Sequence, residues 1–371
     1  MKSKARESTR YRVEGLPESW NEKFLEIGRL KPIKAGNLSI HFDRSPDIFA
    51  IPKITSCKNV PLGFFDGDHL IGFAIASYQK RYIRGDLKDV IYLGNLHVTE
   101  KGTSRIFLEK MSERVRQKVQ NRPEVKYLYA YVMQSNQPAR KLAGLGHLDS
   151  KVAGSISMST IFTLKPVSEN RLYFVRKAGF SDIDRIVELL SEEFRNQILA
   201  PEMNREVFIR NLENRPDVKI GNYYLAVRGD EIVGACLAWD MTSIKKNRIQ
   251  YHGFKMNFIR QTYNFAARLA GSKPLPKQDK AMKDVTIAEY AVRDRNPVIM
   301  EALLRFIYRE YRRKGYHSLI FGCATSDPII HAVKPFISRE VRSNVIIAPL
   351  QRDSERDFEN FSGIYADAIQ I

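Results

Sequence analysis

The pattern of apolar and polar positions predicts a short strand at residues 37–42 and a three-stranded antiparallel meander over residues 60–98. The turn sequences Asp66-Gly67-Asp68 and Arg84-Gly85-Asp86 each lie between two apolar runs, a pattern typical of β-hairpins. The strands expected here are Asn37–Phe42, Val60–Phe65, Leu70–Tyr78 continuing through Tyr78–Ile83, and Val90–Val98.

After Val98 the apolar spacing changes from that of a strand to that of a helix. Ile106, Met111 and Val115 are separated by charged residues, which predicts an amphipathic helix. The elements expected next are a buried strand at Tyr127–Met133, a helix at Pro138–Leu145 that ends at Gly146, and a strand at Ser155–Leu164.

The same order of elements recurs from residue 172 onward. The expected elements are strand Leu172–Arg176, helix Ile183–Phe194, hairpin Tyr223–Val227 with Ile232–Trp239, strand Asp284–Val292, helix Asn296–Arg313, strand Ser318–Cys323, a helix opened by Ser326-Asp327-Pro328, and closing strands at Val345–Ile347 and Tyr365–Ile371. The repeat predicts an α/β protein with a mixed sheet, built from two similar domains in tandem, residues 1–168 and 169–371.

The second copy contains an insertion at about residues 245–283. Its aromatic residues Phe254, Phe258, Tyr263 and Phe265 have helical spacing. A helix that covers a cleft and a helix packed into the core are both compatible with this pattern, and core packing is the more common outcome for such a stripe.

Composition narrows the classes of protein. The 371 residues include 43% hydrophobic residues, and their three distant cysteines form no metal-binding or disulfide pattern. No run approaches the about 18 apolar residues of a membrane span, and the basic N-terminus lacks an apolar signal segment, so we expect a cytoplasmic protein.

The net charge of +18 favours anionic partners such as phosphate-bearing cofactors, nucleic acid or acidic membrane surfaces. Nucleic acid is the less favoured partner, because no basic run is longer than Arg312-Arg313-Lys314.

One segment of the sequence is a candidate for a functional site. Tyr92–Val98 leads into the basic, glycine-containing loop Thr99–Arg105, and a predicted helix follows. This segment resembles the central strand and pyrophosphate loop of the GNAT superfamily of N-acetyltransferases. Asn136-Gln137-Pro138-Ala139 looks like the family's next helix start, and Phe42–Phe49 is similar to the opening of uncharacterised bacterial GNAT proteins.

The resemblance implies an acyl-CoA site in the first domain. Backbone N–H groups at a helix start, assisted by its dipole and by basic side chains, hold a pyrophosphate. The residues that the resemblance assigns to acetyl-CoA or another acyl-CoA are Leu96, Val98, Lys101, Gly102, Thr103, Ser104, Arg105 and Asn136. The equivalent segment of the second domain, Arg293–Pro297, has no glycine, so the first domain is the better candidate.

The catalytic group is less clear from the sequence. The family often places a Glu or His an even number of residues before the strand's final Val, where this chain has Tyr92 and Gly94. Tyr92 is therefore the candidate, able to order a water. His97 and Glu289 have the opposite parity and are expected on the other face of their strands.

Three functions follow from these observations. The leading one is an N-acyltransferase that moves an acetyl or other acyl group to a small-molecule or peptide amine acceptor. The alternatives are a catalytically degenerate GNAT-fold binding or regulatory module, and a transferase that uses aminoacyl-tRNA. His41 and Asp43 share one face of a predicted strand. They could form a metal or catalytic pair, but an exposed strand face is the more common explanation.

Overall fold

The computed structural model describes residues 10–30, 33–35, 38–100, 102–135, 150–251, 253–351 and 363–371. The elements of the first half of the sequence are β1 Tyr11–Gly15, α2 Asn21–Leu30, β2 Ile33–Ala35, β3 Leu38–Asp43, α3 Ala50–Thr55, β4 Lys58–Asp66, β5 His69–Ile83, β6 Asp86–Val98, α4 Ser104–Val119, β7 Val125–Met133 and β8 Lys151–Phe162. Those of the second half are β9 Phe174–Lys177, α6 Ile183–Arg195, α7 Arg205–Asn214, β10 Tyr223–Arg228, β11 Glu231–Trp239, β12 Lys246–Tyr251, α8 Gly253–Leu269, β13 Asp284–Val292, α9 Pro297–Arg313, β14 Ser318–Ala324, the 3-10 helix η5 Pro328–Val333 and β15 Ser338–Pro349.

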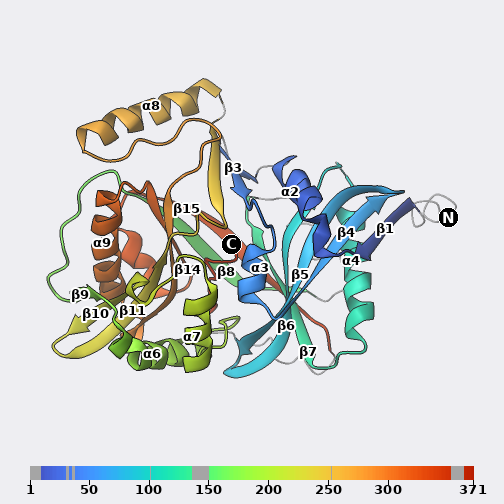
Figure 1. The fold of residues 1–371 in the computed structure, drawn as a ribbon, viewed down its shortest axis with the longest axis horizontal. Coiled ribbons are helices and arrows are strands. Elements are labelled where there is room, and N and C mark those ends of the chain that lie inside the picture. Colours follow the sequence, from blue (N-terminus) through green and yellow to red (C-terminus); the bar gives the residue numbers. More distant parts are fainter. Residues whose placement is uncertain are drawn as a thin grey trace.

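A twelve-stranded sheet runs through the part of the chain that the structure describes (Figure 1). Its order is β1-β4-β5-β6-β7-β15-β8-β14-β13-β11-β10-β9. Two pairs, β6 with β7 and β13 with β14, are parallel, and the other pairs are antiparallel. The mixed α/β sheet expected from the sequence is confirmed.

The two halves of the sequence exchange strands at the centre of this sheet. β15, from the second half, lies between β7 and β8 of the first half. β8, from the first half, lies between β15 and β14 of the second half. The division at residue 168 stays a prediction, and the strands on either side of it are interleaved.

A three-stranded sheet, β12-β3-β2, links the insertion of the second half to the first half. β12 pairs antiparallel with β3 along its whole length, from Lys246 opposite Asp43 to Tyr251 opposite Leu38. The insertion therefore begins as part of the contact between the halves.

Helices cover both faces of the large sheet and define its cores. α4 packs Phe107 and Met111 on one face of the first half, and α2 packs Phe24 on the other. In the second half α9 covers one face, while α6 and α7 cover the opposite face. Successive strand residues can therefore be buried on both sides, which explains the nearly continuous burial of β5 and β13.

The central strands β6 and β13 share an irregularity. Each contains a bulge with one residue at positive φ, Asn95 (52°) and Glu289 (42°). The bulge lies three residues before the final Val of each strand, Val98 or Val292. Parallel pairing stops before it, at Tyr92 opposite Tyr129 in the first half, so β6 and β7 separate beyond this point.

Several expected elements differ from the structure. Tyr365–Ile371 is not a strand, because the chain turns at Asp367, whose carbonyl accepts the N–H groups of Gln370 and Ile371. β1, α2 and α7 were not expected from the sequence. The helix predicted at Pro138–Leu145 lies outside the described residues.

Candidate functional site

A cavity of about 860 Å³ extends through the gap between β6 and β7 and into the contact between the two halves. On one side of the sheet it reaches Leu93, Met111 and Leu128, which belong to the core beneath α4. On the other side it is lined by Tyr92 and by residues of β8, β13, β14 and the 241–249 segment. The separation of two parallel strands thus opens a passage from one face of the sheet to the other.

The start of α4 lies at one end of this cavity. Ser104, Leu96 and Val98 line it. The first N–H groups of a helix have no partner within the helix, and the first turn of α4 has no acidic side chain. This end of the cavity is therefore suited to an anionic group.

The remaining residues assigned to the cofactor have different positions. Gly102, at φ 86°, precedes the helix in open space, and the hydroxyl of Thr103 donates to the Glu100 carbonyl at 3.2 Å. The exposed Arg105 forms an ion pair with Glu109 at 2.8 Å. Lys101 and Asn136 lie outside the described residues.

Tyr92 lines the cavity where the pairing of β6 with β7 ends, and its ring covers Gly94. A Cβ atom at residue 94 would be only 2.6 Å from Cε1 of Tyr92, so glycine is required for this ring position. The ring also packs on Tyr129 and Tyr131, with centroid distances of 5.1 Å and 5.8 Å. Desolvation, with a smaller contribution from Tyr129, raises the pKa of Tyr92 above its ordinary value. The hydroxyl therefore stays protonated and acts as a hydrogen-bond donor rather than a base.

The expected orientation of His97 is wrong, because the bulge at Asn95 reverses the parity of the strand. The ring of His97 stacks on Phe73 at 5.3 Å, and both Tyr92 and His97 line the cavity. Regular alternation would have placed them on opposite faces. Burial lowers the pKa of His97 to about 4, so the imidazole is neutral near pH 7.

Glu289 also differs from its expected position. It lies on the corresponding bulge of β13, where its carboxylate pairs with Arg215 at 2.5 Å and accepts the hydroxyl of Tyr223 at 2.5 Å. Both ends of the ion pair are buried. This carboxylate is committed to a structural ion pair beneath α7.

The second half has carboxylates where the first half has the start of α4. Arg295, just before α9, forms ion pairs with Glu193 and Asp327. The pocket beside them is also lined by Glu192 and Asp294. Arg185 and Arg293 line the same pocket, so these carboxylates lie among cations. The choice of the first half as the better nucleotide candidate stays a prediction.

Polar groups gather on the floor of the main cavity, at the start of β13. Asp284 accepts hydrogen bonds from the Ser318 hydroxyl at 2.5 Å and from the Asn247 amide at 3.1 Å. Burial raises the pKa of Asp284 to about 6. Burial, together with repulsion from Arg44, lowers the pKa of Lys245 to about 7, and its ammonium donates to the Ile371 carbonyl oxygen at 2.5 Å. Two groups that titrate near neutral pH therefore line the same cavity.

No sequence motif marks these residues. Lys245 and Asn247 are at the boundary of the insertion, and Asp284 begins a predicted strand, positions with no catalytic motif. Arg44 belongs to the segment similar to bacterial proteins, and its Nε has no hydrogen-bond partner among the described residues. Lys245, Asn247 and Asp284 come from separate segments of the second half and Arg44 comes from the first half, so these groups meet only in the folded protein.

The second expectation for His41 and Asp43, an exposed strand face, is wrong for Asp43. Both residues line the cavity, and the carboxylate of Asp43 is buried against Arg248 at 2.8 Å. Burial alone would raise the pKa of Asp43, but hydrogen bonds from Ser45 and Arg248 outweigh it and lower the pKa to about 2. Asp43 therefore fixes the β3–β12 contact as a permanent anion.

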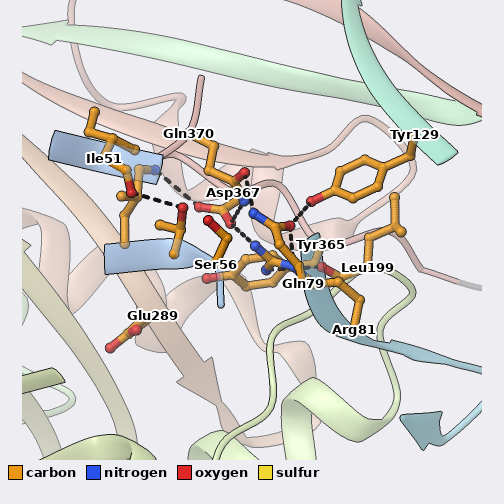
Figure 2. A network of polar contacts seen from close by, with 12 residues as sticks. Ile51, Ser56, Gln79, Arg81, Tyr129, Leu199, Glu289, Tyr365, Asp367 and Gln370 are labelled. Carbon is orange, nitrogen blue, oxygen red and sulfur yellow. Dashed lines mark hydrogen bonds and ion pairs between the residues drawn. The ribbon is translucent and has the colours of Figure 1, made fainter. Parts of the chain in front are cut away.

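A buried polar network holds the C-terminal segment beside this cavity (Figure 2). Arg81 of β5 pairs with Asp367 at 3.1 Å and donates to Gln79 at 2.9 Å. Gln79 in turn donates to Gln370 at 2.9 Å and accepts the hydroxyl of Tyr129 at 2.6 Å. Because every member has a partner, the segment that carries Gln370 into the cavity wall is positioned rigidly.

Comparisons with known proteins address the fold. No family model and no curated protein matches the sequence. Among solved structures, a GCN5-related N-acetyltransferase from Sphaerobacter thermophilus is similar over 92% of this chain and 96% of its own, with a TM-score of 0.55 and 14% identity. The chain has the GNAT fold.

Two further structures have the same fold over most of this chain. An N-myristoyltransferase from Saccharomyces cerevisiae with bound myristoyl-CoA is 11% identical, with a TM-score of 0.57, covering 92% of this chain and 79% of its own. A probable N-acyltransferase from Enterococcus faecalis V583 is 10% identical, with a TM-score of 0.50, covering 93% and 74%. The described helices include none that is long and apolar enough to cross a membrane.

Proposed function

We propose that the protein is an N-acyltransferase that uses acyl-CoA. The observation that carries this proposal is the continuous cavity between the start of α4 and the floor at Asp284. The pyrophosphate would lie at the N–H groups of α4 near Ser104, and the thioester would pass between β6 and β7 beside Tyr92. The resemblance of the Tyr92–Arg105 segment and the GNAT fold both support this arrangement.

The reaction divides the cavity into a donor end and an acceptor end. The acceptor amine would approach from the floor, attack the thioester carbon and displace the CoA thiolate, while losing one proton. Asp284, with its pKa near 6, and Lys245, with its pKa near 7, are the candidates to accept that proton near neutral pH. The protonated hydroxyl of Tyr92 would donate a hydrogen bond to the oxygen or sulfur that gains charge.

The lining supports an acyl chain longer than acetyl. On the α4 face of the sheet, the cavity is lined by apolar side chains that include Met111, Val115 and Leu128. The yeast N-myristoyltransferase structure contains myristoyl-CoA. We include a long-chain donor in this proposal, with a small-molecule or peptide amine as acceptor.

A calorimetric titration tests the donor site. Acetyl-CoA and palmitoyl-CoA are added separately to wild type, to Leu96→Glu and to Leu87→Glu. Leu96 and Leu87 are on the same strand and similarly exposed, at 39% and 38%, but Leu96 lines the cavity and Leu87 does not. A carboxylate at 96 would repel the CoA phosphates, so we expect at least a tenfold loss of affinity for Leu96→Glu and none for Leu87→Glu.

Transfer itself is measured by release of the CoA thiol with a panel of amines. Turnover by wild type that is lost in Asp284→Asn with acyl-CoA affinity unchanged would support the acceptor end of the proposal. Absence of binding to either acyl-CoA by wild type would overturn it. Equal losses in Leu96→Glu and Leu87→Glu would place the nucleotide elsewhere.

A further inference from the structure

Helix α8 has a row of large apolar side chains that face away from the protein. Phe254, Phe258, Phe265 and Leu269 are 86%, 59%, 64% and 76% exposed. Their spacing puts them on one face of the helix, and the rings of Phe254 and Phe258 stack at 6.5 Å. The expectation that this aromatic stripe packs into the core is therefore wrong for these phenylalanines.

The opposite face of α8 attaches the helix to the protein. Ala267 is fully buried, and the ring of Tyr263 contacts Phe162 of β8 at 5.9 Å. Asn264 exchanges two hydrogen bonds with the backbone of Leu275, accepting at 2.7 Å and donating at 3.2 Å. Figure 1 shows α8 along the outer edge of the molecule, away from the large sheet. The apolar row is thus held facing outward.

The surroundings of the row are cationic. α8 contains no Asp or Glu. The exposed residues Lys255 and Arg268 flank the row, and the exposed Lys273, Lys277 and Lys280 follow in the next loop. The protein as a whole has a net charge of +18. A helix with an aromatic face and cationic flanks is the pattern of helices that lie in a membrane interface.

We propose that α8 docks on the surface of a bilayer that contains anionic lipids. The four side chains would enter the region between headgroups and acyl chains, and the flanking cations would contact the headgroups. A second copy of the chain suits this face less well, because symmetric contact would bring Lys255 and Arg268 close to the same cations. A partner protein is a different occupant, which the experiment separates.

This docking would bring the acceptor end of the cavity near the bilayer. β12 runs directly into α8, and its residues Asn247 and Ile249 line the cavity. The docking itself does not depend on the proposed acyl transfer, and the following experiment measures it without acyl-CoA.

Sedimentation with lipid vesicles tests the proposal. Wild type is mixed with vesicles of phosphatidylcholine alone and of phosphatidylcholine with one third phosphatidylglycerol. The test variant is Phe254→Ser/Phe258→Ser/Phe265→Ser. The control is Leu172→Ser/Phe174→Ser/Phe180→Ser, which changes residues that are 70%, 68% and 79% exposed elsewhere. Thermal unfolding of all three proteins checks that the exposed substitutions leave the fold intact.

We expect wild type and the control to bind the anionic vesicles and to be released by salt, with at least a tenfold lower partition coefficient for the α8 variant. Equal binding to neutral vesicles, equal losses in both variants, or no binding by wild type would overturn the proposal. So would concentration-dependent self-association of wild type that the α8 substitutions abolish while vesicle binding persists, since α8 would then be a protein-binding surface.

Discussion

At the residue scale, Asp284 lines the cavity, and its ionisation also makes the free energy of unfolding depend on pH. Its carboxyl group is buried among Ser318 and Asn247, and burial raises its pKa from the ordinary 3.8 to about 6. A raised pKa means that the folded protein favours the protonated form. The stabilisation is complete below about pH 4 and is lost as the pH rises through 6.

We predict that Asp284→Asn removes this loss, because the amide stays neutral at all pH values. A shift of about 2 units corresponds to ~3 kcal/mol, so the variant should gain up to that much relative to wild type between pH 4.5 and 7.5. Urea unfolding at four pH values in this range measures the difference. Asp68→Asn, at a fully exposed side chain, is the control and should show no such trend. A difference that is constant with pH would contradict the assignment.

The residues of the site could be predicted only in part. Four predicted residues line the cavity: Tyr92, Leu96, Val98 and Ser104. They could be predicted because all of them belong to one local motif, a strand followed by a helix start. Lys245 and Asp284 could not be found this way, since their proximity depends on distant segments. The strand face on which His97 and Glu289 lie was predicted wrongly, because a one-residue bulge in each strand reverses the alternation of side chains. An Asn after Gly94 was the available signal, because Asn tolerates positive φ better than most residues.

At the element scale, the start of α4 has two properties that one substitution can separate. An acidic residue in the first turn of a helix interacts favourably with the helix dipole, yet it repels a phosphate bound at the same N–H groups. The first turn of α9 also has no acidic side chain, and it does not line the cavity. The two helices therefore form a natural pair for comparison.

We predict that Ser104→Asp stabilises the protein slightly while it weakens acyl-CoA binding. The dipole interaction contributes about 0.3–1 kcal/mol to the free energy of unfolding, and affinity should fall at least tenfold. Val298→Asp adds the same charge at the start of α9, outside the cavity and close to Glu193 and Asp327, so we expect little stabilisation and an unchanged affinity. Urea unfolding and calorimetric titration measure the two effects, and a loss of affinity in both variants would contradict the assigned site.

Elements defined by local signals were predicted well, and those defined by their surroundings were not. The hairpins around Asp66-Gly67-Asp68 and residues 228–231 follow directly from turn sequences. The periodicity of α8 indicated a helix but not that its aromatic row is uncovered. Apolar residues at 365–371 suggested a strand, whereas the backbone of Asp367 bonds into a turn.

At the scale of the whole molecule, the exchange of β8 and β15 makes the two halves depend on each other. The repeat of element order indicated two similar folds, but element order alone does not say which strands pair. Without residues 169–371, β7 would lose its partner β15, and β8 would lose both neighbours. Edge strands with unpaired backbone groups and exposed apolar faces are prone to aggregate.

We therefore predict that residues 1–168 and 169–371, produced separately, each fail to unfold cooperatively, and that the two co-purify when produced together. Cleavage of the folded chain at a protease site placed within residues 165–170, where the chain is largely exposed and outside the sheet, is the matched control. The cleaved protein should remain one particle in gel filtration, because β8 and β15 keep the halves interleaved. Its midpoint in urea should become dependent on protein concentration, since unfolding now separates two chains. If residues 1–168 alone gave a sharp urea transition, the first half would close its sheet without β15, and the cavity floor would be an addition to a self-sufficient donor domain.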